Sequence, residues 1–316
     1  MEKLKNILEN NQIIIYFFSV ILGIFSAFVF TFEGDLTQII NLSLIFMIFV
    51  TFLQIPLQDI YKSLKNYRFL FALLVSNFVF IPILVFILLL FVQDVFYIKF
   101  AIAFVLLAPC IDYVVTFSHL AKANSKLLLS TTPVLLLAQM LLLPVYLKLF
   151  VGLSGEFSYE PFLEAFLMFI ILPLFLAFLI QFFSKRVKLV KKCEDILLLF
   201  PVISTAFVLF VVMLFALSSI SENFKSVLVA VPIFIAFSVS APLVGFFVSK
   251  IFGLNVENKR AICFSSATRN SLVILPFAYA VNSEYAHIIA LIFVTQTTIE
   301  LIFELLYIKF IPRFVN

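Results

Sequence analysis

The chain has 316 residues, of which 64% are hydrophobic and only 12% are charged, and its formal net charge is +4. A soluble domain has about 25% charged residues, so this chain has too few charges to cover a water-facing surface. The composition indicates an integral membrane protein and excludes a sizeable soluble domain. A role in nucleic-acid binding does not follow from the positive charge, because the side on which the charges lie matters more in a membrane protein.

Ten apolar runs, each long enough to cross a bilayer, follow one another along the chain. A spanning helix needs about 20 apolar residues, and backbone groups in lipid must be paired within their own segment, which favours helices over strands. We therefore predict an all-α polytopic membrane protein with ten transmembrane helices. We place these spans at about 12–32, 37–58, 69–92, 97–119, 127–151, 161–183, 196–218, 226–251, 260–281 and 286–311.

The basic residues are distributed unevenly between the two sides of these spans. With a cytoplasmic N-terminus, Lys99, Lys148 and Lys225 lie on the opposite side and Arg269 lies within a span. All the other Lys and Arg residues lie on the cytoplasmic side. The positive-inside rule then places both termini in the cytoplasm, and we predict a multi-pass protein of the cell (inner) membrane.

The spans also predict two inverted repeats of five helices. We assign the first repeat to residues 1–183, a basic cytoplasmic connection to 184–195, and the remainder of the second repeat to 196–316, with its first helix at about 161–183. In many secondary transporters such repeats place the substrate site near the midplane, where discontinuous helices cross. The fourth and ninth spans are the most polar and occupy equivalent positions, so we expect both to be broken and to cross each other.

Two ionisable residues lie inside these two spans. Asp112 ends the sequence APCID at 108–112, and Arg269 lies in SSATRNS at 265–271. A charge at the centre of a span costs about 2.5–3.5 kcal/mol on insertion scales, so it usually faces a partner or a watery cavity. The two residues could form a structural ion pair, or Arg269 could attract an anion while Asp112 carries a proton. The N–H groups freed at a helix break favour an anion site.

Other polar residues within the spans complete the set of candidate site residues. For single polar side chains the ordinary role is hydrogen bonding between helices, and a lone cysteine is more often a packing residue. Glu304 lies one helical turn after Glu300, and we expect it to approach the cytoplasmic headgroups. The residues we assign to substrate binding are Cys110, Asp112, Arg269, Asn270 and Ser271. The residues we assign to coupling or support are Asn77, Gln139, Ser265, Gln296 and Glu300.

Several kinds of chemistry find no support in the sequence. The three cysteines are widely spaced and only two histidines are present, so neither a disulfide framework nor a metal site is indicated. Nucleotide-binding, hydrolase, metalloprotease and haem motifs are missing from the sequence. We therefore predict a protein that is not an enzyme, needs no cofactor, and has a small-molecule or ionic substrate.

Four segments resemble a known group of transporters. Residues 108–126, APCIDYVVTFSHLAKANSK, resemble the fourth-helix motif of the bile acid/sodium symporter superfamily, and the Ala-Pro-Cys opening looks like its arsenite-permease branch. The segments at 132–147, 265–280 and 294–314 look like the group labelled arsenic-resistance proteins. The resemblance implies a secondary transporter with ten spans and crossing fourth and ninth helices.

This sequence departs from the sodium-coupled members at three positions. Those members have a Ser-Asn pair where this chain has Val114 and Val115, and a Glu where we align Ser265. Both changes remove hard oxygen ligands of the kind that an alkali cation needs. The departures favour protons over sodium as the coupling ion, with Asp112 or Glu300 as the carrier.

Two functions therefore remain open. The first is proton-coupled antiport that exports arsenite or antimonite, with the soft sulfur of Cys110 as a ligand. The second is transport of a small organic or inorganic anion bound at Arg269, with Cys110 as a packing residue. The arsenite permeases have an acidic residue in the ninth-helix motif where this chain has Arg269 and Asn270, and this difference keeps the anion alternative open. A third possibility is a membrane sensor or a scaffold for a partner protein. Such a protein would need an extramembrane surface, and the connections between the predicted spans are too short to form one.

Overall fold

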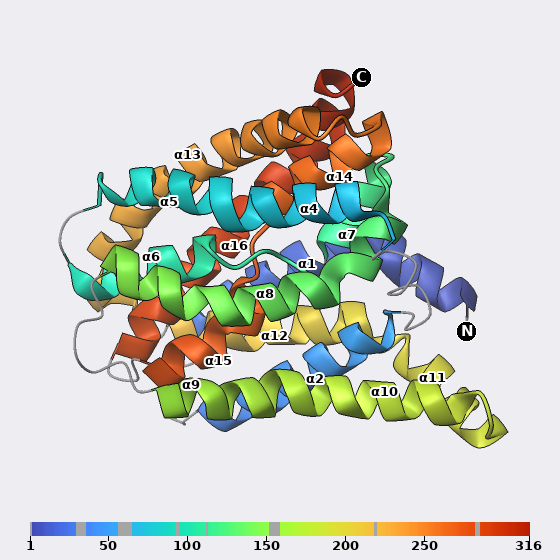
Figure 1. Ribbon diagram of the computed structural model, residues 1–316. Coiled ribbons are helices and arrows are strands. Elements are labelled where there is room, and N and C mark those ends of the chain that lie inside the picture. Colours follow the sequence, from blue (N-terminus) through green and yellow to red (C-terminus); the bar gives the residue numbers. More distant parts are fainter. Residues whose placement is uncertain are drawn as a thin grey trace. The chain divides into compact units, whose positions relative to one another are not determined.

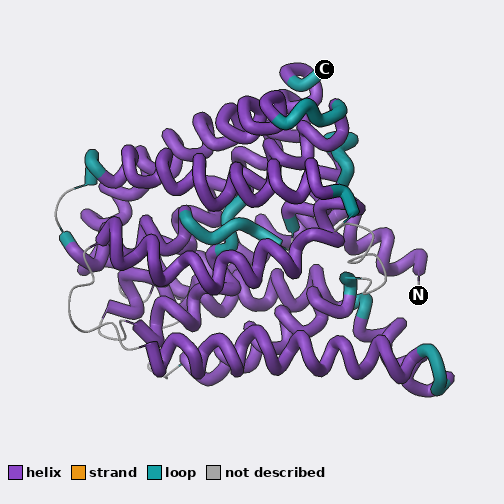
Figure 2. The backbone as a smooth tube through the Cα atoms, viewed as in Figure 1, coloured by secondary structure: helices purple, strands orange, loops and turns teal. Residues whose placement is uncertain are grey.

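The structure is a computed structural model that describes residues 2–29, 36–55, 65–92, 95–111, 113–151, 159–217, 220–281 and 285–316. Within these residues every regular element is a helix (Figure 2). The predicted all-α class is therefore confirmed for the described part of the chain. Asp112, one of the candidate site residues, lies outside the described residues.

Seven helices in the described residues are long and apolar enough to cross a membrane, judged by length and composition. Their bounds are Lys3–Val29, Tyr67–Leu89, Ser125–Val151, Leu163–Ser184, Phe200–Leu217, Leu228–Ile251 and Ala286–Phe314. Two shorter apolar helices are Thr37–Leu53 and Phe96–Leu106. The chain is thus a polytopic membrane protein, while the full set of ten spans remains a prediction.

Contacts between residues divide the chain into two compact units. The first unit comprises Met1–Pro56, Ser158–Asn223 and Leu275–Val294. The second unit comprises Leu57–Phe157, Phe224–Ile274 and Thr295–Asn316. Each unit combines segments that are distant in the sequence.

The first unit contains a group of helices packed side by side (Figure 1). In chain order they are α1 (Glu2–Val29), α2 (Thr37–Leu53), α9 (Tyr159–Phe166), the π-helical η2 (Leu167–Ile171), α10 (Leu172–Ser184), α11 (Lys188–Leu197) and α12 (Phe200–Leu217). Helix α12 packs along α1 and α2, and α2 also packs along α10. The segment 184–195, expected as a basic connection, thus includes most of helix α11.

The end of α2 is held by a glutamine from α10. The side-chain amide of Gln181 donates to the main-chain oxygens of Phe52, Leu53 and Ile55, at 3.4, 3.1 and 3.0 Å. Carbonyl groups in the last turn of a helix have no N–H partner within that helix. Gln181 supplies the missing donor, which explains why a polar residue of this apolar helix is buried.

The second unit contains the helices around the broken spans. In chain order they are α4 (Tyr67–Val75), the π-helical η1 (Ser76–Phe80), α5 (Ile81–Leu89), α6 (Phe96–Leu106), α7 (Val114–Leu120), α8 (Ser125–Val151) and α14 (Val256–Ala267). Three helices run from one unit into the other: α13 (Ile220–Ile251), α15 (Ser271–Val281) and α16 (Ala286–Phe314). Helix α8 packs along both α6 and α7, and α14 packs on α4, α7 and α8.

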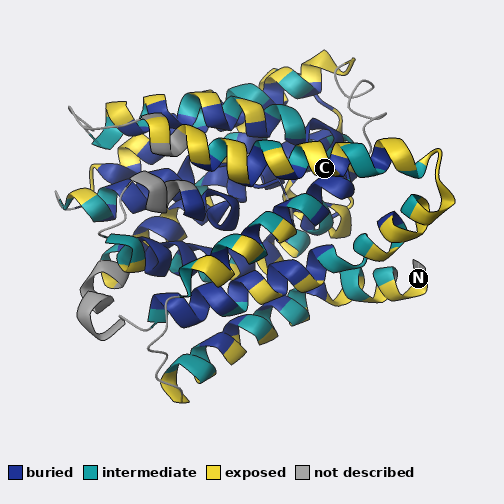
Figure 3. Ribbon diagram, turned by 90° about the horizontal axis from the view of Figure 1, so that it is seen from below, coloured by how far each residue is buried: buried dark blue, intermediate teal, exposed yellow. Residues whose placement is uncertain are grey.

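Large apolar side chains remain exposed along the outer faces of individual helices (Figure 3). In α13 the exposed positions recur every four or seven residues, which is the spacing of one helical face. They are Leu228, Ile235, Val239, Leu243, Phe247 and Ile251. An apolar exposed stripe of this kind fits contact with lipid.

The opposite face of α13 approaches α14 very closely at Gly245. A Cβ atom at this position would lie 2.7 Å from the Ser266 hydroxyl oxygen and 2.9 Å from Cα of Cys263. Both distances are shorter than van der Waals contact, so only glycine fits without movement of α14. Close approach through small residues is the usual way in which membrane helices pack.

Proline residues free carbonyl groups in two helices of the second unit, and a tyrosine binds each of them. Pro82 lacks the N–H that would bond to the carbonyl of Phe78, and the π-helical segment η1 lies just before it. The hydroxyl of Tyr146 on α8 donates to this Phe78 oxygen. The proline therefore distorts α4–α5 locally without leaving a buried carbonyl unpaired.

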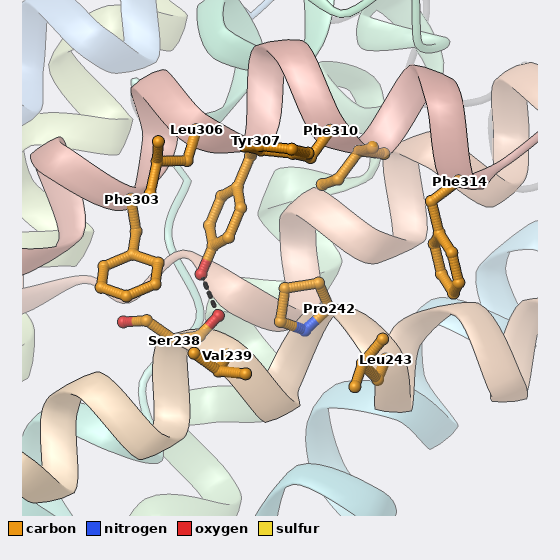
Figure 4. Close-up of a pocket in the computed structure, with 10 residues that line it drawn as sticks. Ser238, Val239, Pro242, Leu243, Phe303, Leu306, Tyr307, Phe310 and Phe314 are labelled. Carbon is orange, nitrogen blue, oxygen red and sulfur yellow. Dashed lines mark hydrogen bonds between the residues drawn. The ribbon is translucent and has the colours of Figure 1, made fainter.

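The same arrangement occurs between α13 and α16. Pro242 cannot donate to the carbonyl of Ser238, and the hydroxyl of Tyr307 donates to that oxygen (Figure 4). Tyr307 is 6% exposed. The hydrogen bond thus joins the two helices at a point where the backbone would otherwise keep an unpaired acceptor in an apolar setting.

We expect Tyr307→Phe to lower the free energy of unfolding by about 1 kcal/mol, in the range found for hydrogen bonds between membrane helices. The variant keeps the ring and leaves the Ser238 carbonyl without its donor. Thermal unfolding of the purified protein in detergent measures the effect. Tyr67→Phe is the matched control because Tyr67 is exposed. Equal melting temperatures for the two variants would contradict the proposed role of the Tyr307 hydroxyl.

Candidate functional site

The two interrupted segments that we predicted as the fourth and ninth spans meet in the second unit. Helix α6 ends at Leu106 and α7 begins at Val114, while α14 ends at Ala267 and α15 begins at Ser271. The two non-helical segments appear as loop segments among the helices in Figure 2. Both predicted interruptions are therefore present, and we call the described residues 107–111, 113 and 268–270 together the crossover.

The two segments of the crossover pair through their backbones. The N–H of Cys110 donates to the Thr268 oxygen at 3.0 Å, and the N–H of Asn270 donates to the Ala108 oxygen at 2.8 Å. Pro109 and Arg269 form the antiparallel bridge between these two hydrogen bonds. Unpaired backbone groups cost several kcal/mol in a membrane interior, so each broken helix supplies partners that the other one needs.

Arg269 lies at the centre of the crossover and is fully buried, with 0% of its surface exposed. Its Nη1 donates to the Leu106 oxygen at 3.3 Å, at the end of α6. Its Nη2 donates to the Ser265 and Ser266 oxygens at 2.6 and 2.7 Å, in the last turn of α14. Nη2 also lies 3.0 Å from the acceptor Oδ1 of Asn77. One guanidinium thus caps the negative ends of two half-helices, where a cation is favourable.

The remaining environment of Arg269 is apolar. The guanidinium carbon lies 5.4 Å from the ring centre of Phe237, within the range of a cation–π contact. Its Nε has no hydrogen-bond partner among the described residues. No carboxylate oxygen of the described residues lies within 4.0 Å of the Arg269 guanidinium. Asp112, the other member of the ion pair that the sequence left open, lies outside the described residues.

Glu300 receives three hydrogen bonds that bind it to the crossover. Its Oε2 accepts from the backbone N–H of Arg269 at 2.7 Å and from Nε2 of Gln296 at 2.5 Å. Its Oε1 accepts from the hydroxyl of Tyr113 at 2.7 Å. The side chain is 2% exposed. Both carboxylate oxygens are satisfied, so Glu300 joins α16 to both broken spans.

The expectation for Glu304 was wrong. We expected it to approach the headgroups, but it is 0% exposed, and its Oε1 is hydrogen-bonded to the hydroxyl of Thr268 at 2.5 Å. The reason is helical geometry: residues four apart lie on the same face. Gln296, Glu300 and Glu304 follow this spacing and all face the crossover side of α16.

Three candidate amide side chains have buried atoms without hydrogen-bond partners among the described residues. They are both side-chain atoms of Gln139, Nδ2 of Asn270 and Oε1 of Gln296. These residues are 0%, 4% and 3% exposed. Buried polar atoms normally have a partner, in the protein or in ordered water. Each unpaired amide therefore marks a position where water or a polar solute would find a hydrogen-bond partner.

The other candidates lie in or beside the crossover. Cys110 is part of the backbone pairing and is 1% exposed. Ser265 accepts from Nδ2 of Asn77 at 3.0 Å, and Ser271 is hydrogen-bonded to Thr297 at 2.5 Å. Cys110, Arg269, Asn270, Asn77, Ser265, Ser271, Glu300 and Gln296 all belong to the crossover or to chains of hydrogen bonds that reach it.

Gln139 is buried on α8. Helix α8 packs along α6 and α7, the helices on either side of the first interruption. The structure therefore places this candidate on a helix that neighbours the crossover, and none of its contacts with the crossover residues is established.

Tyr113 and Thr268 belong to the network but were not among the candidates. Tyr113 donates to Glu300, and Thr268 is bonded to Glu304. Both lie inside the segments 108–126 and 265–280 that carry the family resemblance. Their place next to the expected breaks was the signal that could have identified them, because polar side chains beside an interrupted membrane helix are the ones that can reach its freed groups.

A groove on the outside of α13 and α16 is apolar and unsuited to an ionic solute (Figure 4). Its volume is about 220 Å³. Its lining residues are Ser238, Val239, Pro242, Leu243, Phe303, Leu306, Tyr307, Phe310, Ile311 and Phe314. Several of these are more than one-third exposed, and none is charged.

The described residues also contain no group of three or more His, Cys, Asp or Glu that could hold a metal.

The fold and the crossover define the class of the protein, a polytopic membrane protein with a polar network at two broken spans. Residues 41–223 match the sodium bile acid symporter family, and this stretch is more than half of the chain. The chain therefore belongs to the sodium bile acid symporter family, whose members are secondary-active transporters and not enzymes. No curated protein matches the chain.

We expect Arg269→Lys to destabilise the folded protein by about 2–3 kcal/mol, the range for hydrogen bonds to a charged group. A lysine keeps the charge, but a single ammonium nitrogen cannot reach the ends of two helices as the planar guanidinium does. Thermal unfolding in detergent measures the loss. Arg68→Lys, at an exposed arginine, is the control. An unchanged melting temperature for the Arg269 variant would show that the two half-helices do not depend on this cap.

Proposed function

We propose that this protein is a proton-coupled secondary transporter that exports arsenite or antimonite and binds it at the crossover. The observation that carries the proposal is the buried amide atoms without partners on Asn270 in the crossover and on Gln296, which donates to Glu300 beside it, together with the thiol of Cys110 in the crossover. Gln139 on the neighbouring helix α8 has further unpaired amide atoms. Polar groups inside a membrane are costly, and they usually line a solute pathway.

This set of groups suits a neutral hydroxide. Arsenite and antimonite are present at neutral pH as neutral trihydroxides, whose hydroxyl groups both donate and accept hydrogen bonds. Amide side chains offer both kinds of partner. The sulfur of Cys110 prefers a soft centre such as arsenic. When the thiol replaces one hydroxyl, an As–S bond forms, an As–O bond breaks, and the thiol proton leaves with the hydroxyl as water.

The use of Arg269 favours a neutral solute over an anion. Both terminal nitrogens of its guanidinium donate to acceptors of the protein itself. An anion bound to these nitrogens would have to displace the carbonyl groups to which they donate. The guanidinium is therefore better suited to holding the half-helices than to binding cargo.

The residues at the crossover support protons over sodium as the coupling ion. Val114 is fully buried at the start of α7, and Ser265 already accepts a hydrogen bond from Asn77. Neither offers the charged oxygen that a sodium ion would need. Buried carboxyl groups are present on α16 instead, and these can bind a proton.

The arrangement of the whole chain in the membrane is part of the proposal. We infer ten spans in two inverted repeats, with both termini in the cytoplasm of an inner-membrane protein. The contacts between tyrosines and freed carbonyls support this inference. Tyr146 of the fifth span binds a carbonyl of the third, and Tyr307 of the tenth binds a carbonyl of the eighth. These spans are equivalent in two repeats of five.

A second candidate function is transport of a small organic or inorganic anion at Arg269. One observation favours it: Nε of Arg269 and Nδ2 of the adjacent Asn270 are both unpaired donors. Two donors on neighbouring residues could bind two oxygens of a carboxylate. This candidate keeps the same fold and the same crossover and makes Cys110 a packing residue.

We expect expression of the wild type to lower arsenite accumulation in an efflux-deficient bacterial strain, and Cys110→Ser to abolish this effect. The serine variant keeps the shape of the site but loses the soft sulfur ligand. Accumulated arsenic measures the effect, with membrane expression checked. Cys263→Ser is the matched control, because Cys263 is equally buried but lies within α14, outside the crossover.

Two outcomes would contradict the arsenite proposal. Full export by Cys110→Ser would remove the thiol from the mechanism. No change in accumulation by a well-expressed wild type would remove arsenite as the substrate and favour the anion candidate. Uptake of a small carboxylate that Asn270→Asp abolishes would then support binding at the two unpaired donors.

A further inference from the structure

The two buried glutamates of α16 differ in their hydrogen-bond partners. Glu300 accepts from two N–H groups, which can only donate, and from the Tyr113 hydroxyl. Glu304 contacts a single hydroxyl, that of Thr268. Its second oxygen, Oε2, has no partner among the described residues. The environment of Glu300 therefore fits a carboxylate, and that of Glu304 does not.

The protons available at Thr268 lead to the same conclusion. Its Oγ1 lies 2.7 Å from the Phe264 oxygen and 2.5 Å from Oε1 of Glu304. A threonine hydroxyl has one proton, and a backbone carbonyl can only accept. If Glu304 were ionised, one of these two short contacts would join two acceptors. If Glu304 carries a proton, its O–H donates to Oγ1 and the threonine O–H donates to Phe264.

Among the residues that the structure describes, the groups around Glu304 do not supply a compensating charge. Ionisable neighbours are Glu300 one turn earlier, Tyr307 on the next turn and Tyr113 of the fourth span. The hydroxyls of Tyr113 and Tyr307 donate to Glu300 and to Ser238. Arg269 follows Thr268, but the contacts of its guanidinium are with other acceptors. Helix α13 packs against α16 at Tyr307, through the hydrogen bond to Ser238. It has no ionisable side chain between residues 228 and 249.

We propose that Glu304 is the proton-binding site of the transporter and that it holds a proton in this conformation. When water reaches the site in another conformation, the carboxylic O–H bond breaks and the proton passes to water, leaving a carboxylate. The Thr268 hydroxyl then turns from the Phe264 carbonyl toward the new carboxylate. Protonation is thereby linked to the last turn of α14, the turn that Arg269 caps. This inference rests on the proposed function for its role in transport.

The proton itself can be detected without any solute. Infrared spectroscopy of the wild type at neutral pH should show a carboxylic acid C=O band that Glu304→Gln removes and Glu300→Gln leaves in place. Thr268→Val should shift this band, because it removes the oxygen to which the acid donates. The valine variant keeps the carboxyl group, so it provides a test if the glutamine variant does not fold. A band that persists unchanged in a folded Glu304→Gln variant would overturn the proposal.

The coupling role is tested in proteoliposomes with arsenite as the probe. A pH gradient should drive arsenite movement by the wild type, a sodium gradient should not, and Glu304→Gln should lose the response to pH. Glu257→Gln, on the first turn of α14, is the control and should keep it. Retention of the pH response by Glu304→Gln would overturn the coupling role. An inactive wild type that still shows the Glu304 band would contradict arsenite transport and leave the proton site supported.

Discussion

A helix that is interrupted inside a membrane leaves backbone N–H and carbonyl groups that need partners within the protein. This constraint determines the arrangement of the second unit. Cys110 and Asn270 donate across the crossover, and Arg269 caps the carbonyl ends of α6 and α14 with one guanidinium. Removing either broken span would leave the other with unpaired groups, so the two breaks stabilise each other. The polar side chains of α16 can then lie beside a non-helical segment without facing lipid.

The buried polar residues in and around the crossover differ in how many of their hydrogen-bonding atoms have partners in the protein. Arg269 and Glu300 have most of their hydrogen-bonding capacity occupied by the protein. Gln139, Asn270 and Glu304 have buried atoms that are not paired in the described residues. The binding free energy of a solute or an ion is most favourable next to a buried polar group that has no partner in the protein. The new hydrogen bond there offsets a desolvation cost that the folded protein already carries. The unpaired atoms are therefore better candidates for transport than the buried charges.

The sequence was sufficient to predict the all-α class and the two interrupted helices. Polar residues and Pro109 within apolar runs predicted both interruptions, and spans of about 20 residues predicted helices. The role of Arg269 could not be predicted, because its partners Asn77 and Leu106 lie 192 and 163 residues away in the sequence. Glu304 was misplaced because its position toward the end of the last span suggested the headgroups, whereas its helical face, shared with Gln296 and Glu300, directs it to the crossover. Whether a buried charge holds the fold together or binds a solute depends on the groups that folding brings next to it. A single sequence does not show which distant residues become neighbours.

The central claim is that the solute binds at the crossover. It is tested most directly by the change in melting temperature of the purified protein when arsenite is added, because a ligand that binds only the folded state stabilises it. The account predicts a rise that depends on arsenite concentration in the wild type and in Cys263→Ser, and none in Cys110→Ser. An equal rise in all three proteins would place arsenite elsewhere and contradict the account.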